Sequence, residues 1–227
     1  MEQTDIQQRL RIFMKEAVLH YFKNPQININ VILNEHCLLI RLHHFLDNEM
    51  ENLVYREDMD VFRSIRELMM EYALKDIQSQ LLEQFGLKLQ ELYYDWDEYD
   101  QSSMIMGMFQ NQVFDIEQPY YPNQKLVHEQ VSHVTYIVEK YPDTIRSFWA
   151  DPHTLVMMRQ GLLVRIEEEL VKEGFQEILR KTKRKVEKTE FLNSNIESVT
   201  ERSLRSAYLD WDFEKDQSVL VYSFHSH

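Results

Sequence analysis

Two Asp-Trp-Asp motifs carry the residues whose types and spacing are best suited to chemistry. Asp95 and Asp97 flank one tryptophan, and Asp210 and Asp212 flank another. In a β-strand, residues i and i+2 share a face about 6–7 Å apart, so each motif predicts a pair of neighbouring carboxylates. Such a pair could hold a hard cation such as Ca²⁺ or Mg²⁺, or supply a general acid and base.

A structural role competes with these chemical roles. Trp96 and Trp211 are expected to point into the core, which leaves the aspartates on the solvent face near the strand ends. Two arginines on neighbouring predicted strands could form cross-strand ion pairs with them. The structural role is favoured, so we predict no catalytic residue. The candidate polar site comprises Arg41, Asp95, Asp97, Arg165, Asp210 and Asp212.

The sequence gives little support for a nucleotide site, a reactive cysteine or a metal site. The chain has 4 glycines, none spaced to wrap a phosphate, which argues against nucleotide sites of the P-loop and Rossmann types. The single cysteine, Cys37, begins an apolar strand and is expected to be a packing residue. His36, His43 and His44 do not share one face of that strand. We therefore predict no cofactor and no metal site.

The chain contains two blocks that each occur twice in the same order. CLLIRLHHFL at residues 37–46 is matched by GLLVRIEEEL at 161–170, an offset of 124 residues. Tyr93-Tyr-Asp-Trp-Asp97 is matched by Tyr208-Leu-Asp-Trp-Asp212, an offset of 115 residues. This repetition indicates a tandem duplication, with roughly nine additional residues between the blocks of the first copy.

Each copy is expected to read helix, hairpin, helix, hairpin. Apolar residues at helical spacing predict an opening helix in each half. β-rich runs separated by short polar stretches predict the hairpins. In the first copy the elements are helix 6–21, strands 29–33 and 37–42, helix 59–85, and strands 89–97 and 104–109. In the second they are helix 127–141, strands 154–158 and 161–166, helical residues 175–199 as one helix or as two joined near Asn193, and strands 206–212 and 218–224.

These elements predict an α+β fold of two tandem α-β-β-α-β-β repeats. In each repeat two helices cover one face of a mostly antiparallel four-stranded sheet, and the repeats pack as a pseudo-twofold pair. The segment Pro119-Tyr-Tyr-Pro122 can neither extend a helix nor complete a central strand, so it marks the boundary. We place the first repeat at 1–112, the linker at 113–122 and the second repeat at 123–227.

Charge and hydropathy bound the class of protein. The net charge of −13 argues against general nucleic-acid binding. The basic run Arg180–Lys185 is expected to be a solvated helix face. No apolar run reaches the roughly 18–20 residues that span a bilayer, and the start of the chain lacks the apolar stretch of a signal peptide. With a single cysteine, the cytoplasm is the expected compartment.

The arrangement resembles the MpsC-like family, small bacterial proteins named for a sodium-translocating, membrane-potential-generating system. The resemblance rests on Leu39-Ile-Arg-Leu42 and Leu163-Val-Arg-Ile166 within the predicted order of elements. It implies a protein partner in a membrane cation or inorganic-carbon transport system, and it carries over no catalytic residues. The glycine-rich turn that often follows the first helix in that family is missing here.

The sequence therefore predicts a non-enzymatic accessory or regulatory protein that binds a protein partner without inserting into a membrane. Two alternatives stay open. One is a sensor with a small ligand or cation held between the repeats, and the other is an enzyme that uses the paired aspartates. Whether the tandem chain forms a homodimer also stays open.

Overall fold

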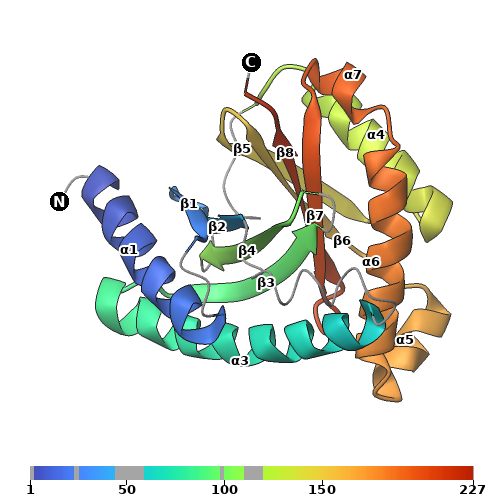
Figure 1. Ribbon diagram of the computed structural model, residues 1–227. Coiled ribbons are helices and arrows are strands. Elements are labelled where there is room, and N and C mark those ends of the chain that lie inside the picture. The colour runs from blue at the N-terminus through green and yellow to red at the C-terminus, as the bar shows by residue number, and fades with distance from the viewer. Residues whose placement is uncertain (1–2, 23–25, 44–58, 98–99, 110–119, 227) are drawn as a thin grey trace. The chain divides into compact units, whose positions relative to one another are not determined.

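The structure is a computed structural model that describes residues 3–22, 26–43, 59–97, 100–109 and 120–226 (Figure 1). The chain divides into two compact units. The first comprises Met1–Leu92 and Glu98–Gln112, and the second comprises Tyr93–Asp97 and Val113–His227. The short segment Tyr93–Asp97 is the end of a strand of the first sheet, yet it belongs to the second unit.

The first unit has the predicted order of elements, with bounds close to those expected. Its sheet has the order β1-β2-β4-β3, in which β1 pairs with β2 and β2 with β4 in antiparallel fashion. The elements are α1 (Gln3–Phe22), β1 (Asn28–Leu33), β2 (Cys37–His43), α3 (Met59–Phe85), β3 (Leu89–Asp97) and β4 (Ser102–Phe109).

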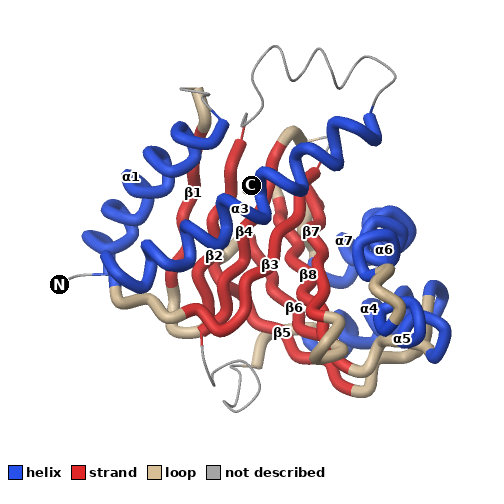
Figure 2. The backbone as a smooth tube through the Cα atoms, turned by 90° about the horizontal axis from the view of Figure 1, so that it is seen from below, coloured by secondary structure: helices blue, strands red, loops and turns tan. Residues whose placement is uncertain are grey.

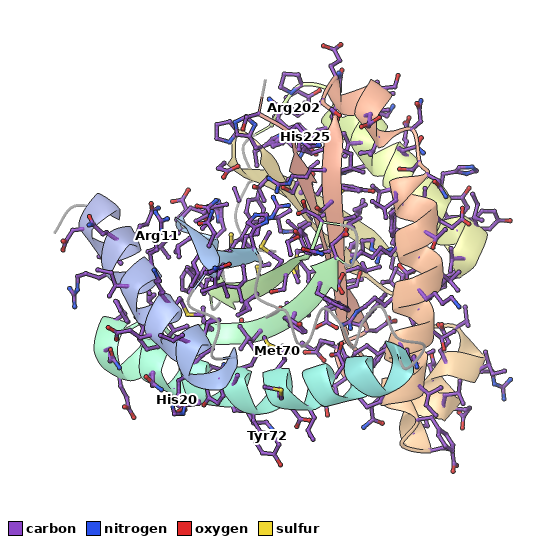
Figure 3. The ribbon with its side chains drawn as sticks, in the orientation of Figure 1. Arg11, His20, Met70, Tyr72, Arg202 and His225 are labelled. Atoms are coloured by element: carbon purple, nitrogen blue, oxygen red, sulfur yellow. The ribbon has the colours of Figure 1, made fainter. Side chains whose placement is uncertain are left out.

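The core of the first unit lies where α1 and α3 meet the sheet. Leu10 on α1 is buried, as are Ile77 and Leu81 on α3, at the helical spacing that predicted these helices. Two residues apart on α3, Met70 is buried whereas Tyr72 projects outward and is 66% exposed (Figure 3). The apolar periodicity therefore identified the face of α3 that covers the sheet.

The second unit repeats the strand order of the first. Its sheet has the order β5-β6-β8-β7, with every neighbouring pair antiparallel. Its helices lie together on one side of the strands (Figure 2). The elements are α4 (Gln124–Val138), β5 (Thr144–Asp151), β6 (Thr154–Gln160), α5 (Arg165–Lys172), α6 (Gln176–Leu192), α7 (Ile196–Thr200), β7 (Leu204–Asp212) and β8 (Gln217–Phe224).

This result confirms the α+β fold with two four-stranded antiparallel sheets, decides one open alternative in the second copy and corrects two of its details. The first hairpin is β5–β6, not 154–158 with 161–166. The helical region divides at Asn193 into α6 and α7, as one of the two alternatives had it. The additional helix α5 means that the described part of this copy has four helices rather than two. The packing of the two repeats as a pseudo-twofold pair stays a prediction.

The predicted strand 161–166 is wrong because amides of this segment donate to carboxylate side chains. Gly161 has φ of +70°, a left-handed conformation that ends β6. The next two amides, of Leu162 and Leu163, donate to Oδ1 of Asp216 at 2.8 and 2.9 Å. Glu167 then accepts from the Val164 amide at 3.0 Å, which starts α5. A Leu-Leu-Val run with both leucines buried is thus held as a loop by carboxylates.

The sheet registers also correct the alignment of the two copies. Ser102 pairs with His43 in the first sheet, and Ser218 pairs with Arg159 in the second. Because both serines follow the same Asp-Gln pair, Arg159 occupies the position of His43 and β6 is the counterpart of β2. The similarity between residues 37–46 and 161–170 is therefore not a structural equivalence.

Candidate functional site

The structure brings Asp95 and Asp210 together within the second unit. Asp95 lies in the segment Tyr93–Asp97 and Asp210 lies in β7. Both side chains are buried, as is Asp97, so the expectation that these aspartates lie on a solvent face is wrong. Asp212, the last residue of β7, is half-buried, and its Oδ1 accepts from the amides of Glu214 and Lys215 in the turn that follows.

The two buried aspartates exchange hydrogen bonds at equivalent positions of their motifs. The Tyr94 amide donates to Oδ2 of Asp210 at 2.9 Å, and the Leu209 amide donates to Oδ2 of Asp95 at 2.9 Å. Each carboxylate therefore satisfies a buried strand amide next to the opposite aspartate, a role that strand carbonyls usually take. This reciprocity is the physical consequence of the repeated motif.

Three cations from α6 complete the arrangement, which we call the aspartate–arginine cluster (Asp95, Asp210, Arg180, Arg184 and Lys188). Arg184 bridges the pair, with Nε 3.1 Å from Oδ1 of Asp95 and Nη2 3.4 Å from Oδ1 of Asp210. Lys188 lies 2.9 Å from Asp95, and Arg180 forms an ion pair with Asp210. The cations are four residues apart, so one stripe of α6 faces β7 (Figure 1).

The cluster is closed to further ligands. All four carboxylate oxygens contact an amide or a cation. The cations also donate to strand carbonyls: Arg180 to Trp211 at 2.8 Å and Arg184 to Tyr94 at 3.0 Å. A metal ion would have to displace Arg184 or Lys188. The arrangement joins backbone segments, and each carboxylate oxygen lies within hydrogen-bond or ion-pair distance of an amide or a cation, although Oδ1 of Asp95 has only the ion pair with Arg184 and no hydrogen bond.

The two arginines predicted to pair with these aspartates lie elsewhere. Arg41, on β2, forms an ion pair with Asp100 at 2.7 Å, and the Ser102 hydroxyl donates to the same oxygen. Arg165 is exposed at the start of α5. The predicted pairing is therefore wrong. Two of the partners, Arg180 and Arg184, come instead from the basic run that was expected to be solvated, and Lys188 follows four residues later. The spacing of four residues was the signal for one shared face.

A second cluster of charged side chains lies in the core between α6 and the sheet. We call it the Lys183 network: Glu139, Arg159, Glu167, Lys183 and Glu187. Arg159 donates from Nη2 to Oε2 of Glu187 at 2.8 Å, with both side chains fully buried. Lys183 forms ion pairs with Glu167 at 3.1 Å and with Glu187 at 3.7 Å, and its Nζ also contacts Oε1 of Glu139.

The Lys183 network holds a proton on one of its three carboxyl groups. Burial, together with the neighbouring carboxyl group of Glu187, raises the pKa of Glu139 to about 9. Burial alone would raise the pKa of Glu187 as well, but Arg159 and the other neighbours lower it. At neutral pH Glu139 is therefore protonated.

A groove of about 540 Å³ runs along the outer side of α4. The His128 ring lies against it, with Nε2 2.7 Å from the Ser147 hydroxyl, which is 2.6 Å from the Tyr121 hydroxyl. Burial lowers the pKa of His128, so the ring is neutral at pH 7. The lining residues are Tyr120, Gln124, Lys125, His128, Glu129, Ser132, His133 and Tyr141. Small-molecule sites commonly have this size.

No metal centre accompanies these features in the part of the chain that the structure describes, where no three His, Cys, Asp or Glu side chains are grouped to hold an ion. Within the same residues, no helix is both long and apolar enough to span a bilayer. Comparison of the chain with models of known families, with curated proteins and with solved structures gave no match.

Replacing Arg184 tests the role of the aspartate–arginine cluster. Arg184→Met removes the cation that bridges two buried carboxylates, and we expect the free energy of unfolding to fall by about 3–5 kcal/mol. Lys185→Met, at the next and exposed position, is the matched control and should change it by less than about 0.5 kcal/mol. Urea denaturation measures both. Equal effects of the two substitutions would contradict the bridging role.

The Lys183 network predicts a particular pH dependence of stability. In the folded state Glu139 binds its proton up to about pH 9, whereas in the unfolded chain it loses the proton near its ordinary value of 4.5. Unfolding therefore releases a proton between these values, and this group's contribution to stability falls as pH rises, by up to about 1.4 kcal/mol per pH unit.

Glu139→Gln removes this titration and keeps an uncharged polar side chain of the same size. Its stability relative to the natural chain should rise steadily from pH 5 to pH 9 in urea denaturation series. Glu129→Gln, at an exposed position of the same helix, should show no such trend. A constant difference between Glu139→Gln and the natural chain would show that Glu139 is ionised in the folded protein.

Proposed function

We propose that this chain is a non-enzymatic accessory or regulatory protein that binds a protein partner. The observation that supports this is the closed state of the aspartate–arginine cluster. Its carboxylates, the residues with the strongest claim to chemistry, bond to backbone amides and to α6 cations. Their arrangement suits a scaffold, and it disfavours an enzyme that uses paired carboxylates.

The proposed partner is a subunit of a membrane cation or inorganic-carbon transport system. This part of the proposal rests on the resemblance to MpsC-like proteins. The absence of a membrane-spanning helix among the described residues is compatible with docking of this chain onto such a subunit.

Capture of the partner tests the proposal. The full chain with an affinity tag is produced at its natural level in its host, cross-linked in intact cells and purified with associated proteins for mass spectrometry. We expect a membrane transport subunit to be enriched about tenfold or more over a tag-only control, a ratio equivalent to about 1.4 kcal/mol of selective binding. Enrichment of no protein would refute the accessory role, and enrichment of soluble enzymes alone would refute the transport association.

The groove along α4 supports a second candidate function, a sensor of a small molecule. Its volume suits a metabolite, and Lys125 and Tyr120 stand exposed beside the neutral His128. A bound ligand at 100 times its dissociation constant would stabilise the fold by about 2.7 kcal/mol. This candidate places the ligand within the second unit.

Thermal-shift screening tests the sensor. We expect at least one compound in a panel of metabolites and divalent cations to raise the melting temperature of the natural chain. Tyr120→Ala with Lys125→Ala should abolish that shift without lowering the melting temperature of the ligand-free protein, because both side chains are exposed. A panel without any shift, or a shift that survives the two substitutions, would remove the groove as the site.

A further inference from the structure

Four large apolar side chains stand exposed where α5 turns into α6. Ile166 is 71% exposed, Leu170 37%, Phe175 48% and Ile178 65%. We call them the α5–α6 stripe. Single exposed apolar residues are ordinary on protein surfaces, but a contiguous group of them usually marks an interaction site.

Backbone geometry shows that the stripe is continuous. Ile166 and Leu170 are four residues apart on α5 and so share a face. At the end of α5, Gly174 adopts φ of +84°, and the Phe175 amide donates to the Leu170 carbonyl at 2.8 Å. This is a Schellman turn, which brings the side chains at these two positions together. Ile178 follows three residues later on α6.

The stripe lies outside because other residues of the same helices form the inner face. On α6 the buried positions are Leu179, Lys183, Glu187 and Phe191, and on α5 Glu167 is buried toward Lys183. The Lys183 network thus occupies positions that apolar residues fill in most helices. Phe175 and Ile178 lie outside these inner positions. Their exposure leaves an apolar surface that the fold of this unit does not use.

The charges around the stripe indicate the chemistry of an occupant. Four glutamates border it in exposed positions: Glu168, Glu169, Glu173 and Glu177. The neighbouring exposed cations are Arg165, Lys172 and Lys181, one fewer than the glutamates; Lys172 already pairs with Glu169 at 2.7 Å, and Arg180 lies 3.9 Å from Glu177. The chain as a whole carries a net charge of −13. A basic surface is therefore complementary, whereas an anionic lipid surface would be repelled.

We propose that the α5–α6 stripe docks a basic amphipathic helix of the partner protein. Apolar anchors of that helix would cover Ile166, Leu170, Phe175 and Ile178, and lysines or arginines on its flanks would face the four glutamates. This is recognition of the apolar face of an amphipathic helix, with electrostatic steering by the border. The proposal rests on the proposed accessory function and identifies the surface and partner chemistry that serve it.

Binding of model peptides to the full chain tests the proposal. The probe is a fluorescein-labelled peptide of about 15 residues, made of leucine and lysine with the leucines at helical spacing. A matched peptide carries glutamate in place of every lysine. Fluorescence anisotropy should show saturable binding of the lysine peptide that weakens with salt, and at least about tenfold weaker binding of the glutamate peptide.

Two variants and a control locate the binding. Ile166→Ser with Ile178→Ser should weaken binding of the lysine peptide by about tenfold or more, since anchor residues dominate such interfaces. Glu173→Gln with Glu177→Gln should weaken it at low salt and reduce its salt dependence. Leu126→Ser, an exposed leucine of α4, should leave it unchanged. All variants should keep the unfolding midpoint of the natural chain, because the substituted side chains are exposed.

Several results would overturn the proposal. They are equal binding of the two peptides, full affinity in the Ile166→Ser and Ile178→Ser variant, or an equal loss in Leu126→Ser. Binding to phosphatidylserine vesicles that depends on the stripe, without peptide binding, would assign the surface to a membrane instead.

The outcomes also separate this proposal from the accessory function itself. A captured partner whose cross-links map away from α5 and α6, and which the stripe variant still retains, would sustain the accessory role and refute the docking site. Peptide binding at the stripe with no partner captured in cells would refute the accessory role while sustaining the surface.

Discussion

The second unit depends on two buried carboxylates that face each other and on the arginine between them. Asp95 and Asp210 each accept the amide that precedes the opposite aspartate, and Arg184 contacts both. Two buried like charges repel strongly in a medium of low dielectric constant, so the pair needs cations within contact distance. The stripe of Arg180, Arg184 and Lys188 supplies them, and it thereby fixes the face that α6 turns toward β7. The segment Tyr93–Asp97 joins the second unit through these contacts.

The Lys183 network extends the same principle into the core. Charged side chains in a core cost several kcal/mol each unless they are paired, and here each charged group has a partner while one carboxyl stays protonated. The positions that Lys183 and Glu187 occupy on α6 are therefore not available to apolar residues. Phe175 and Ile178 lie outside instead, on a surface whose acidic border suits a basic helix. The buried ion pairs and the proposed docking surface thus both follow from the sequence of α6 and the residue before it, which places charged residues on the inner face and apolar residues on the outer one.

Local patterns predicted most of the fold. The bounds of β3 were predicted to the residue, and α3 ends at Phe85 as expected, because alternation and helical periodicity report burial directly. The same logic failed for Leu162–Val164, where an apolar run reads like a strand. Its amides bond to the Asp216 side chain, a contact between residues more than fifty positions apart that no local pattern encodes. That error misaligned the two copies and placed Arg165 on a strand.

The sequence predicted one part of the candidate site, its carboxylates, and missed the other part, its cations. The repeated motif singled out the aspartates, but their cations come from a helix whose basic residues have the composition of a solvated face.

A double-mutant cycle between Arg184→Met and the pair Asp95→Asn with Asp210→Asn tests the central claim most directly, with unfolding free energies as the readout. The account predicts that Arg184→Met lowers the free energy of unfolding by about 1–3 kcal/mol less in the chain with both asparagine substitutions than in the natural chain. An equal cost in both backgrounds would show that Arg184 does not hold the two motifs together.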